Sequence, residues 1–166
     1  MSKPMNHVAV SVTDIDLAMK WYRDIMGFTV LMEPVEIFTE PADTDIAKIA
    51  SNILGPKFKK MAMCHMSSGN GVGFEIFQLI EPKAELREDN FEYWKNGFYH
   101  ICVTDPNIEE LVKQIASSGG KKRSAIFELM PGKKICFCED PFGNIIEIYS
   151  HSYEQFWSNL PRLSTT

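Results

Sequence analysis

Two histidines and two glutamates recur at matched positions in the two halves of this 166-residue chain. When His7 is laid on His100 without a gap, the apolar positions that follow also coincide, so the chain reads as a tandem repeat. Glu75 and Glu147 each follow a glycine by four residues, near the end of their half. Two imidazoles and two carboxylates suit a divalent ion such as Zn, Ni, Co, Mn or Fe. The pattern therefore gives two matched pairs of candidate metal ligands, His7 with Glu75 and His100 with Glu147.

A site of this composition can move protons on a small metabolite. Four protein ligands leave two adjacent positions of an octahedral ion, which two neighbouring oxygens of a substrate can fill. A Lewis acid on a carbonyl oxygen acidifies the adjacent C–H and stabilises the enediolate formed when that proton leaves. A glutamate that loosens from the ion can then serve as general base. Glu75 and Glu147 are therefore candidate catalytic residues as well as candidate ligands.

Each candidate histidine belongs to a short strand that feeds a helix. Alternating apolar residues over 7–12 predict a strand, and apolar residues at helical spacing over 15–26 predict an amphipathic helix. The second copy repeats this order, with a strand near 98–104 and a helix over 108–115. Because side chains alternate along a strand, we expect each histidine on the face turned away from its helix.

Further strands complete the order strand, helix, strand, strand, strand in both halves. A stretch over 40–56 has no counterpart in the second half. It predicts a short helix, starting from Asp43 or Thr44, that either walls a site or decorates the surface. Residues 81–95 are polar and form a candidate linker. The remaining strands are expected near 28–39, 59–66 and 72–80 in the first half, and near 121–129, 133–138 and 144–150 in the second.

Composition narrows the classes of partner. The net charge is −5 and no basic run stands out, which argues against nucleic acid and anionic membranes as partners. No apolar segment reaches about 18 residues, so no membrane span is expected. Four cysteines without CxxC spacing fit a reduced cytoplasmic interior better than a disulfide framework.

Each site residue also has a structural interpretation. A lone histidine on a strand is more often a structural residue than a ligand, but the matched repeat favours ligation here. A glutamate inside an apolar run is costly to bury unless it is paired or bound to a metal. His65, on the strand before Glu75, is either a third imidazole of the site or an ordinary packed or exposed residue.

Four segments of the chain, NHVAVSV, FEIFQ, YHICV and EDPFGNIIEIYS, resemble the vicinal oxygen chelate superfamily. That superfamily includes glyoxalase I, methylmalonyl-CoA epimerase, extradiol dioxygenases, and fosfomycin- and bleomycin-resistance proteins. The resemblance implies an α+β fold in which two tandem βαβββ modules form a curled eight-stranded sheet with one metal on its concave face. It also implies the same four ligands, and a homodimer in which modules pair within one chain or across two.

The resemblance also implies domain limits. A single domain over 1–150 would contain a first module over about 5–81 and a second over about 97–150, followed by a C-terminal tail over 151–166.

The ligand set is most similar to that of glyoxalase I, with methylmalonyl-CoA epimerases also close. Glyoxalase I carries an arginine and an asparagine that grip glutathione, and this chain has Ser11 and Leu79 there. We therefore expect a metal-dependent isomerase, epimerase or lyase that acts through an enediolate on a small metabolite with vicinal oxygens, without glutathione. The alternatives are an Fe(II) extradiol-type dioxygenase and a non-catalytic ligand-binding protein of the resistance type.

Overall fold

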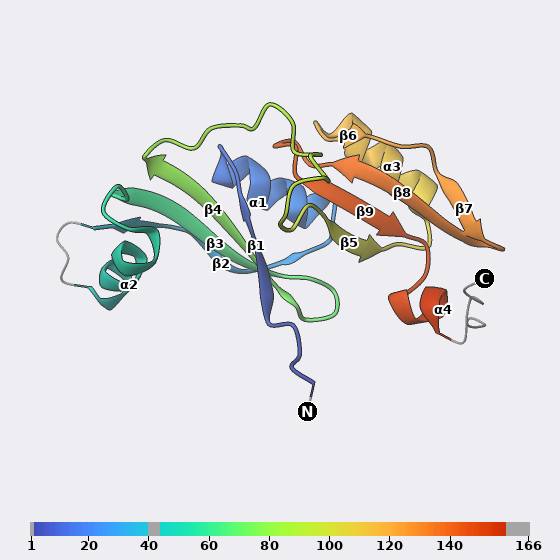
Figure 1. Cartoon of the computed structure of the whole chain (residues 1–166), viewed down its shortest axis with the longest axis horizontal. Coiled ribbons are helices and arrows are strands. Elements are labelled where there is room, and N and C mark those ends of the chain that lie inside the picture. The colour runs from blue at the N-terminus through green and yellow to red at the C-terminus, as the bar shows by residue number, and fades with distance from the viewer. Residues whose placement is uncertain (1, 40–43, 159–166) are drawn as a thin grey trace. The chain divides into compact units, whose positions relative to one another are not determined.

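The structure is a computed structural model that describes residues 2–39 and 44–158. The chain divides into two compact units, Met1–Glu88 and Asp89–Thr166 (Figure 1). Each unit has its own sheet, with a helix packed across one face. The predicted α+β class is therefore confirmed.

The first unit is built on a four-stranded sheet. Its strand order is β1-β4-β3-β2, and the first and last strands of the unit are parallel neighbours. The other two strand pairs are antiparallel. In chain order the elements are β1 (His7–Ser11), α1 (Ile15–Asp24), β2 (Thr29–Phe38), α2 (Asp45–Leu54), β3 (Lys60–Ser67) and β4 (Gly73–Glu81).

Helix α1 forms the core of the first unit against one face of this sheet. Its N-cap is Asp14, whose carboxylate accepts a hydrogen bond from the backbone N–H of Leu17 at 2.9 Å. The fully buried ring of Tyr22 lies 4.5 Å from the ring of Phe74 on β4 and 5.7 Å from that of Phe28. Of the predicted apolar stripe, Ile15, Ala18, Met19 and Tyr22 are buried on α1, whereas Ile25 and Met26 follow the helix and are half-buried.

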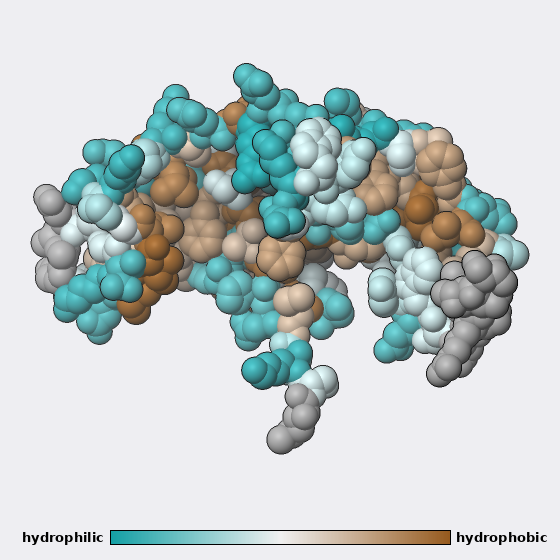
Figure 2. Space-filling view, viewed as in Figure 1, coloured by the Kyte–Doolittle hydropathy of each residue, from teal (hydrophilic) through white to brown (hydrophobic). Residues whose placement is uncertain are grey.

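Helix α2 is the helix predicted in the stretch over 40–56. Thr44 caps it by accepting from the N–H of Ala47 at 3.3 Å, and Gly55 follows it with φ 80°. Asp43, the alternative start, falls in the part of the stretch that lies outside the described residues. Part of the exposed surface of α2 is apolar, and Figure 2 shows hydrophobic surface there. Its large exposed apolar residues are Ile46, Ile49, Ile53 and Leu54.

The second unit repeats the order of the first. Its sheet runs β5-β9-β8-β6, with β7 also paired to β8, and the first and last strands of the sheet are again parallel neighbours. The elements are β5 (Ile101–Thr104), α3 (Ile108–Ser117), β6 (Lys121–Lys122), β7 (Phe127–Met130), β8 (Lys133–Glu139), β9 (Ile145–Tyr149) and α4 (Tyr153–Trp157).

The prediction of one continuous strand over 121–129 is wrong. It is split into β6 and β7, which gives the second sheet five strands. At the break the side chain of Ser124 replaces a backbone partner, because its hydroxyl accepts from the N–H of Phe137 at 2.9 Å. The backbone N–H groups of Arg123 and Ser124 both donate to the Phe137 carbonyl, so the regular ladder is interrupted.

The core of the second unit lies between helix α3 and the strands β8 and β9. Helix α3 buries its predicted stripe, while Cys136 and Cys138 are fully buried on β8. In the tail, Phe156 of α4 is fully buried and its ring lies 4.3 Å from that of Tyr149. Among the helices of residues 2–39 and 44–158, none has the length and apolar content that crossing a membrane requires.

Candidate functional site

Each unit brings its predicted histidine and glutamate together. In the first unit the Nε2 atom of His7 lies 3.6 Å from the Oε2 atom of Glu75. In the second unit the same two atom types, of His100 and Glu147, are 3.4 Å apart. We call these the first pair and the second pair. The repeat seen in the sequence is thus also a repeat of side-chain geometry within each unit.

Parallel pairing of the first and last strands creates this geometry. Glu75 pairs with Ala9 of β1, two residues after His7. Glu147 pairs with Cys102 of β5, two residues after the second histidine. Because side chains two residues apart share a strand face, the histidine and the glutamate meet on one face of each sheet. The second histidine directly precedes β5 instead of lying within the predicted strand over 98–104.

Matched turns set the register of the glutamate strands. Gly71 and Gly143 have φ 80° and 82°, a left-handed conformation that glycine adopts without steric cost. The N–H of Gly71 donates to the carbonyl of Ser68, and the N–H of Gly143 donates to that of Asp140. A glycine in each turn therefore places the glutamate four residues later at the equivalent point of its strand.

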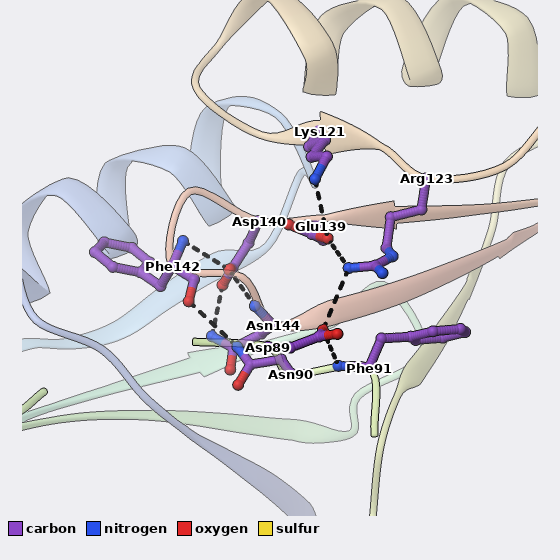
Figure 3. Close-up of polar contacts among 9 residues, drawn as sticks. All are labelled: Asp89, Asn90, Phe91, Lys121, Arg123, Glu139, Asp140, Phe142 and Asn144. Atoms are coloured by element: carbon purple, nitrogen blue, oxygen red, sulfur yellow. Dashed lines mark hydrogen bonds and ion pairs between the residues drawn. The ribbon is translucent and has the colours of Figure 1, made fainter. Parts of the chain in front are cut away.

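The side chain of Asp140 holds the turn that precedes β9, the strand that carries Glu147 (Figure 3). Its Oδ1 accepts from the N–H of Phe142 at 2.9 Å and from the N–H of Asn144 at 2.8 Å. Its Oδ2 accepts from the side-chain amide of Asn144 at 2.8 Å, and Asp140 is only 2% exposed. The Asp and Asn of the DPFGN segment are thus structural residues that hold β9 in place.

The first histidine fits closely against the last strand of its unit. A Cβ added at Gly73 would come within 2.9 Å of the Cβ of His7, so only glycine leaves room for this histidine. The Nδ1 of His7 lies 2.8 Å from the side-chain oxygen of Asn6. Because an amide oxygen only accepts, this contact favours hydrogen on Nδ1 and a lone pair on Nε2, the atom nearer Glu75.

The second pair is less accessible than the first. The side chain of Glu147 is 11% exposed, against 21% for Glu75. Burial raises the pKa of Glu147, while His100 and a hydrogen bond from Cys102 act in the opposite direction. The buried Nδ1 of His100 has no hydrogen-bond partner among the described residues. A buried polar atom in this state requires an ion, a water or a ligand nearby to offset its desolvation.

Residues 89–91, predicted to belong to a linker, instead pack on the second sheet. Arg123 bridges Asp89 at 3.8 Å and Glu139, and its guanidinium lies 4.6 Å from the centre of the Phe91 ring (Figure 3). The Phe91 ring in turn contacts the ring of Phe137, which lies 5.6 Å from that of His100. Sequence gave no signal for this contact, because it depends on an ion pair between distant residues.

Helix α2 lies on the same sheet face as the first pair. Ala50 of α2 packs in a cluster with residues of β2 and β3, against which Phe77 also packs. Phe77 follows Glu75 by two residues on β4, so both side chains are on that face. The opposite face carries α1. That the stretch walls the site, one of its two predicted roles, stays a prediction.

His65 is a third residue beside the first pair, and the sequence left its role open. It pairs directly with Glu75 across β3 and β4, and its Nδ1 lies 3.3 Å from the Oε1 of Glu75. The equivalent partner of Glu147 across β8 and β9 is Phe137. The turn between the strands could have revealed this pairing, because His65 and Glu75 are equidistant from Asn70.

The donor sets within the units are suited to metal binding but incomplete. Each pair offers one imidazole nitrogen and one carboxylate oxygen, ligands common to Zn, Fe, Co, Ni and Mn. Among the residues that the structure describes, no group of three or more His, Cys, Asp or Glu side chains is arranged to hold a metal ion. An ion therefore needs donors beyond those of one pair.

Residues 5–148 match the Glyoxalase/Bleomycin resistance protein/Dioxygenase superfamily. The chain belongs to this superfamily. The match includes both histidine–glutamate pairs, and the resemblance described from the sequence is thereby confirmed.

Individual proteins resemble this chain at low sequence identity. Glyoxalase I of Saccharomyces cerevisiae is 23% identical over 156 residues, which cover 88% of this chain and 43% of the yeast protein. A glyoxalase family protein from Bacillus cereus superposes with a TM-score of 0.72 at 15% identity, covering 90% of this chain and 94% of that one. Glyoxalase I from Zea mays gives a TM-score of 0.61 at 20% identity, and the superposition covers 91% of this chain and 46% of the maize chain. The chain thus spans less than half of these two glyoxalase I proteins.

The Asp140 turn yields a stability prediction. Replacing Asp140→Ala leaves two backbone N–H groups without their acceptor, which should lower the free energy of unfolding by about 2–4 kcal/mol. Urea unfolding followed by fluorescence measures this loss. The control Glu110→Ala removes an exposed side chain of the same unit and should change stability by less than about 0.5 kcal/mol. Equal stability of the two variants would contradict this role of Asp140.

Proposed function

We propose that this protein is a divalent-metal-dependent isomerase, epimerase or lyase that acts through an enediolate on a small metabolite with vicinal oxygens. The observation that carries the proposal is the repeated pair, in which Nε2 of a histidine lies 3.6 or 3.4 Å from Oε2 of a glutamate in each unit. Two independent copies of such a contact in one chain are difficult to explain as structural ion pairs alone.

The residues proposed to hold the metal are His7, Glu75, His100 and Glu147. Together they complete the donor set that neither pair supplies alone, either within one chain or between two copies. In the second pair, Nε2 of His100 would be the nitrogen that binds the ion, since it is the ring atom beside Oε2 of Glu147. A bound divalent ion would supply Lewis acidity toward a carbonyl oxygen of the substrate.

The chain itself would supply the base. Glu75 and Glu147 are the carboxylates beside the proposed site, and either can accept the α-proton of a substrate. A solved relative supports the choice of substrate class. A mutant of the fosfomycin resistance protein FosX of Listeria monocytogenes, 12% identical with a TM-score of 0.58, was crystallised with Mn(II) and 1S,2S-dihydroxypropylphosphonic acid. That ligand is a small molecule with adjacent oxygens.

We also propose that the protein forms a homodimer. The exposed isoleucines of α2 give the first unit an apolar face that pairing could cover. The donor sets could then be completed within one chain or across two.

The first test is metal binding. Purified protein without a tag should hold about one divalent ion per site, measured by elemental analysis. His7→Ala and His100→Ala should each lose most of the ion, because removing one ligand severely weakens a site of four. His151→Ala is the matched control, since the Nδ1 of His151 contacts the hydroxyl of Ser150 and belongs to neither pair. Full retention of metal in both ligand variants would overturn the proposed site.

The second test concerns the reaction. A panel of α-hydroxyaldehydes and α-hydroxyketones, incubated with the metal-loaded enzyme in deuterium oxide, should include members that take up deuterium at the α-carbon, as detected by NMR. Glu147→Gln keeps an oxygen ligand but cannot accept the proton, so exchange should fall about 100- to 10,000-fold. Stoichiometric oxygen consumption without exchange would instead establish the dioxygenase alternative.

The third test concerns glutathione. The positions that grip glutathione in glyoxalase I are Ser11 and Leu79 here, so two charged or hydrogen-bonded contacts are absent. At about 1.5–3 kcal/mol per contact, turnover of methylglyoxal plus glutathione should be at least about 100-fold below that of a glyoxalase I assayed in parallel. Comparable turnover by the two enzymes would show that glutathione is a substrate component after all.

A further inference from the structure

The two units differ at the residue that faces the glutamate from the neighbouring strand. In the first unit this residue is His65, which pairs with Glu75 across β3 and β4. In the second unit it is Phe137, which pairs with Glu147 across β8 and β9. The parallel pairing of the first and last strands and the histidine–glutamate contact occur in both units, so this position distinguishes the two glutamates.

Glu75 lies between two imidazoles, and each imidazole contacts a different oxygen. Nε2 of His7 is 3.6 Å from Oε2, and Nδ1 of His65 is 3.3 Å from Oε1. A carboxylate with one oxygen toward each ring cannot rotate about its last bond without losing both contacts. The contact with His65 therefore orients the Glu75 oxygen that faces His7.

Glu147 has no such support from its neighbouring strand, which the structure describes in full. The ring of Phe137 offers no polar hydrogen, and it contacts His100 through an edge-to-face arrangement. A hydrogen bond from Cys102 reaches the carboxylate, but a thiol is a weak donor. The second carboxylate therefore has no imidazole support across the sheet.

We infer that His65 is a positioning residue that keeps Glu75 in place as a metal ligand. This inference rests on the proposed function and gives Glu75 a support that Glu147 lacks on its neighbouring strand. Partners that orient a ligating side chain typically change metal affinity about 10- to 100-fold when they are removed.

The arrangement of donors favours a supporting role for His65 over direct ligation. His65 approaches the oxygen of Glu75 that does not contact His7. Within the described parts of the chain, no three His, Cys, Asp or Glu side chains, those of His7, His65 and Glu75 included, are grouped as a metal site. His65 thus acts on the proposed site through Glu75.

The test measures affinity for Co(II) alone, by competition with a chromophoric chelator. His65→Phe introduces the residue that the second unit has at this position, and it should weaken binding about 10- to 100-fold. His65→Asn places an amide N–H near the position of Nδ1 and should recover most of the affinity. The control His151→Phe makes the same replacement outside both pairs and should bind Co(II) like the wild type. Circular dichroism confirms that each variant is folded.

A double-mutant cycle tests whether His65 acts through Glu75. If it does, adding His65→Phe to Glu75→Ala should cause no further loss of Co(II) affinity. The visible spectrum of bound Co(II) should also keep its intensity in His65→Asn, because the ligands themselves are unchanged.

Each outcome decides one question. Additive losses in the cycle would show that His65 binds the metal directly, and unchanged affinity in a folded His65→Phe would show that it has no role. Either result overturns this inference alone, provided that the wild type binds Co(II) and His7→Ala does not. Absence of binding by the wild type would overturn the proposed function and the inference together.

Discussion

The pairing of the first strand with the last strand of each unit is the constraint on which the candidate site depends. In both units these strands are parallel, and the glutamate pairs with the residue two positions after the histidine. A shift of one residue would turn either side chain to the opposite face, toward the helix. The left-handed glycines Gly71 and Gly143 protect this register by fixing where each glutamate strand begins.

The two faces of each sheet have different roles. One face is apolar and packs against α1 or α3, which stabilises the unit through burial. The other face carries the histidine and the glutamate, whose burial is tolerable only when polar groups or an ion compensate for lost water. In the first unit α2 packs on that second face. The described part of the second unit has no equivalent helix there, so the two histidine–glutamate pairs have different surroundings. A repeated fold thus provides two similar but unequal sets of donors.

The two sets of donors differ most in the residues around their glutamates. Glu75 has His65 across the sheet, whereas Glu147 has Phe137, whose ring joins the contacts made by Phe91 and His100. Nearly symmetric side chains can therefore differ in mobility and in solvation without any change in the backbone. Under the proposed mechanism, such differences would let one carboxylate hold a metal while the other exchanges a proton.

The sequence by itself determined the α+β class, the repeat and both histidine–glutamate pairs, because strand alternation, helix periodicity and glycine turns are local signals. Only the tertiary structure showed that β6 and β7 are separate strands, that Asp89 and Phe91 pack on the second sheet, and that His65 faces Glu75. These features depend on contacts between residues far apart in the chain. The turn centred on Asn70 could have indicated that His65 faces Glu75, but the other contacts could not be predicted, since they follow from the packing of the whole unit.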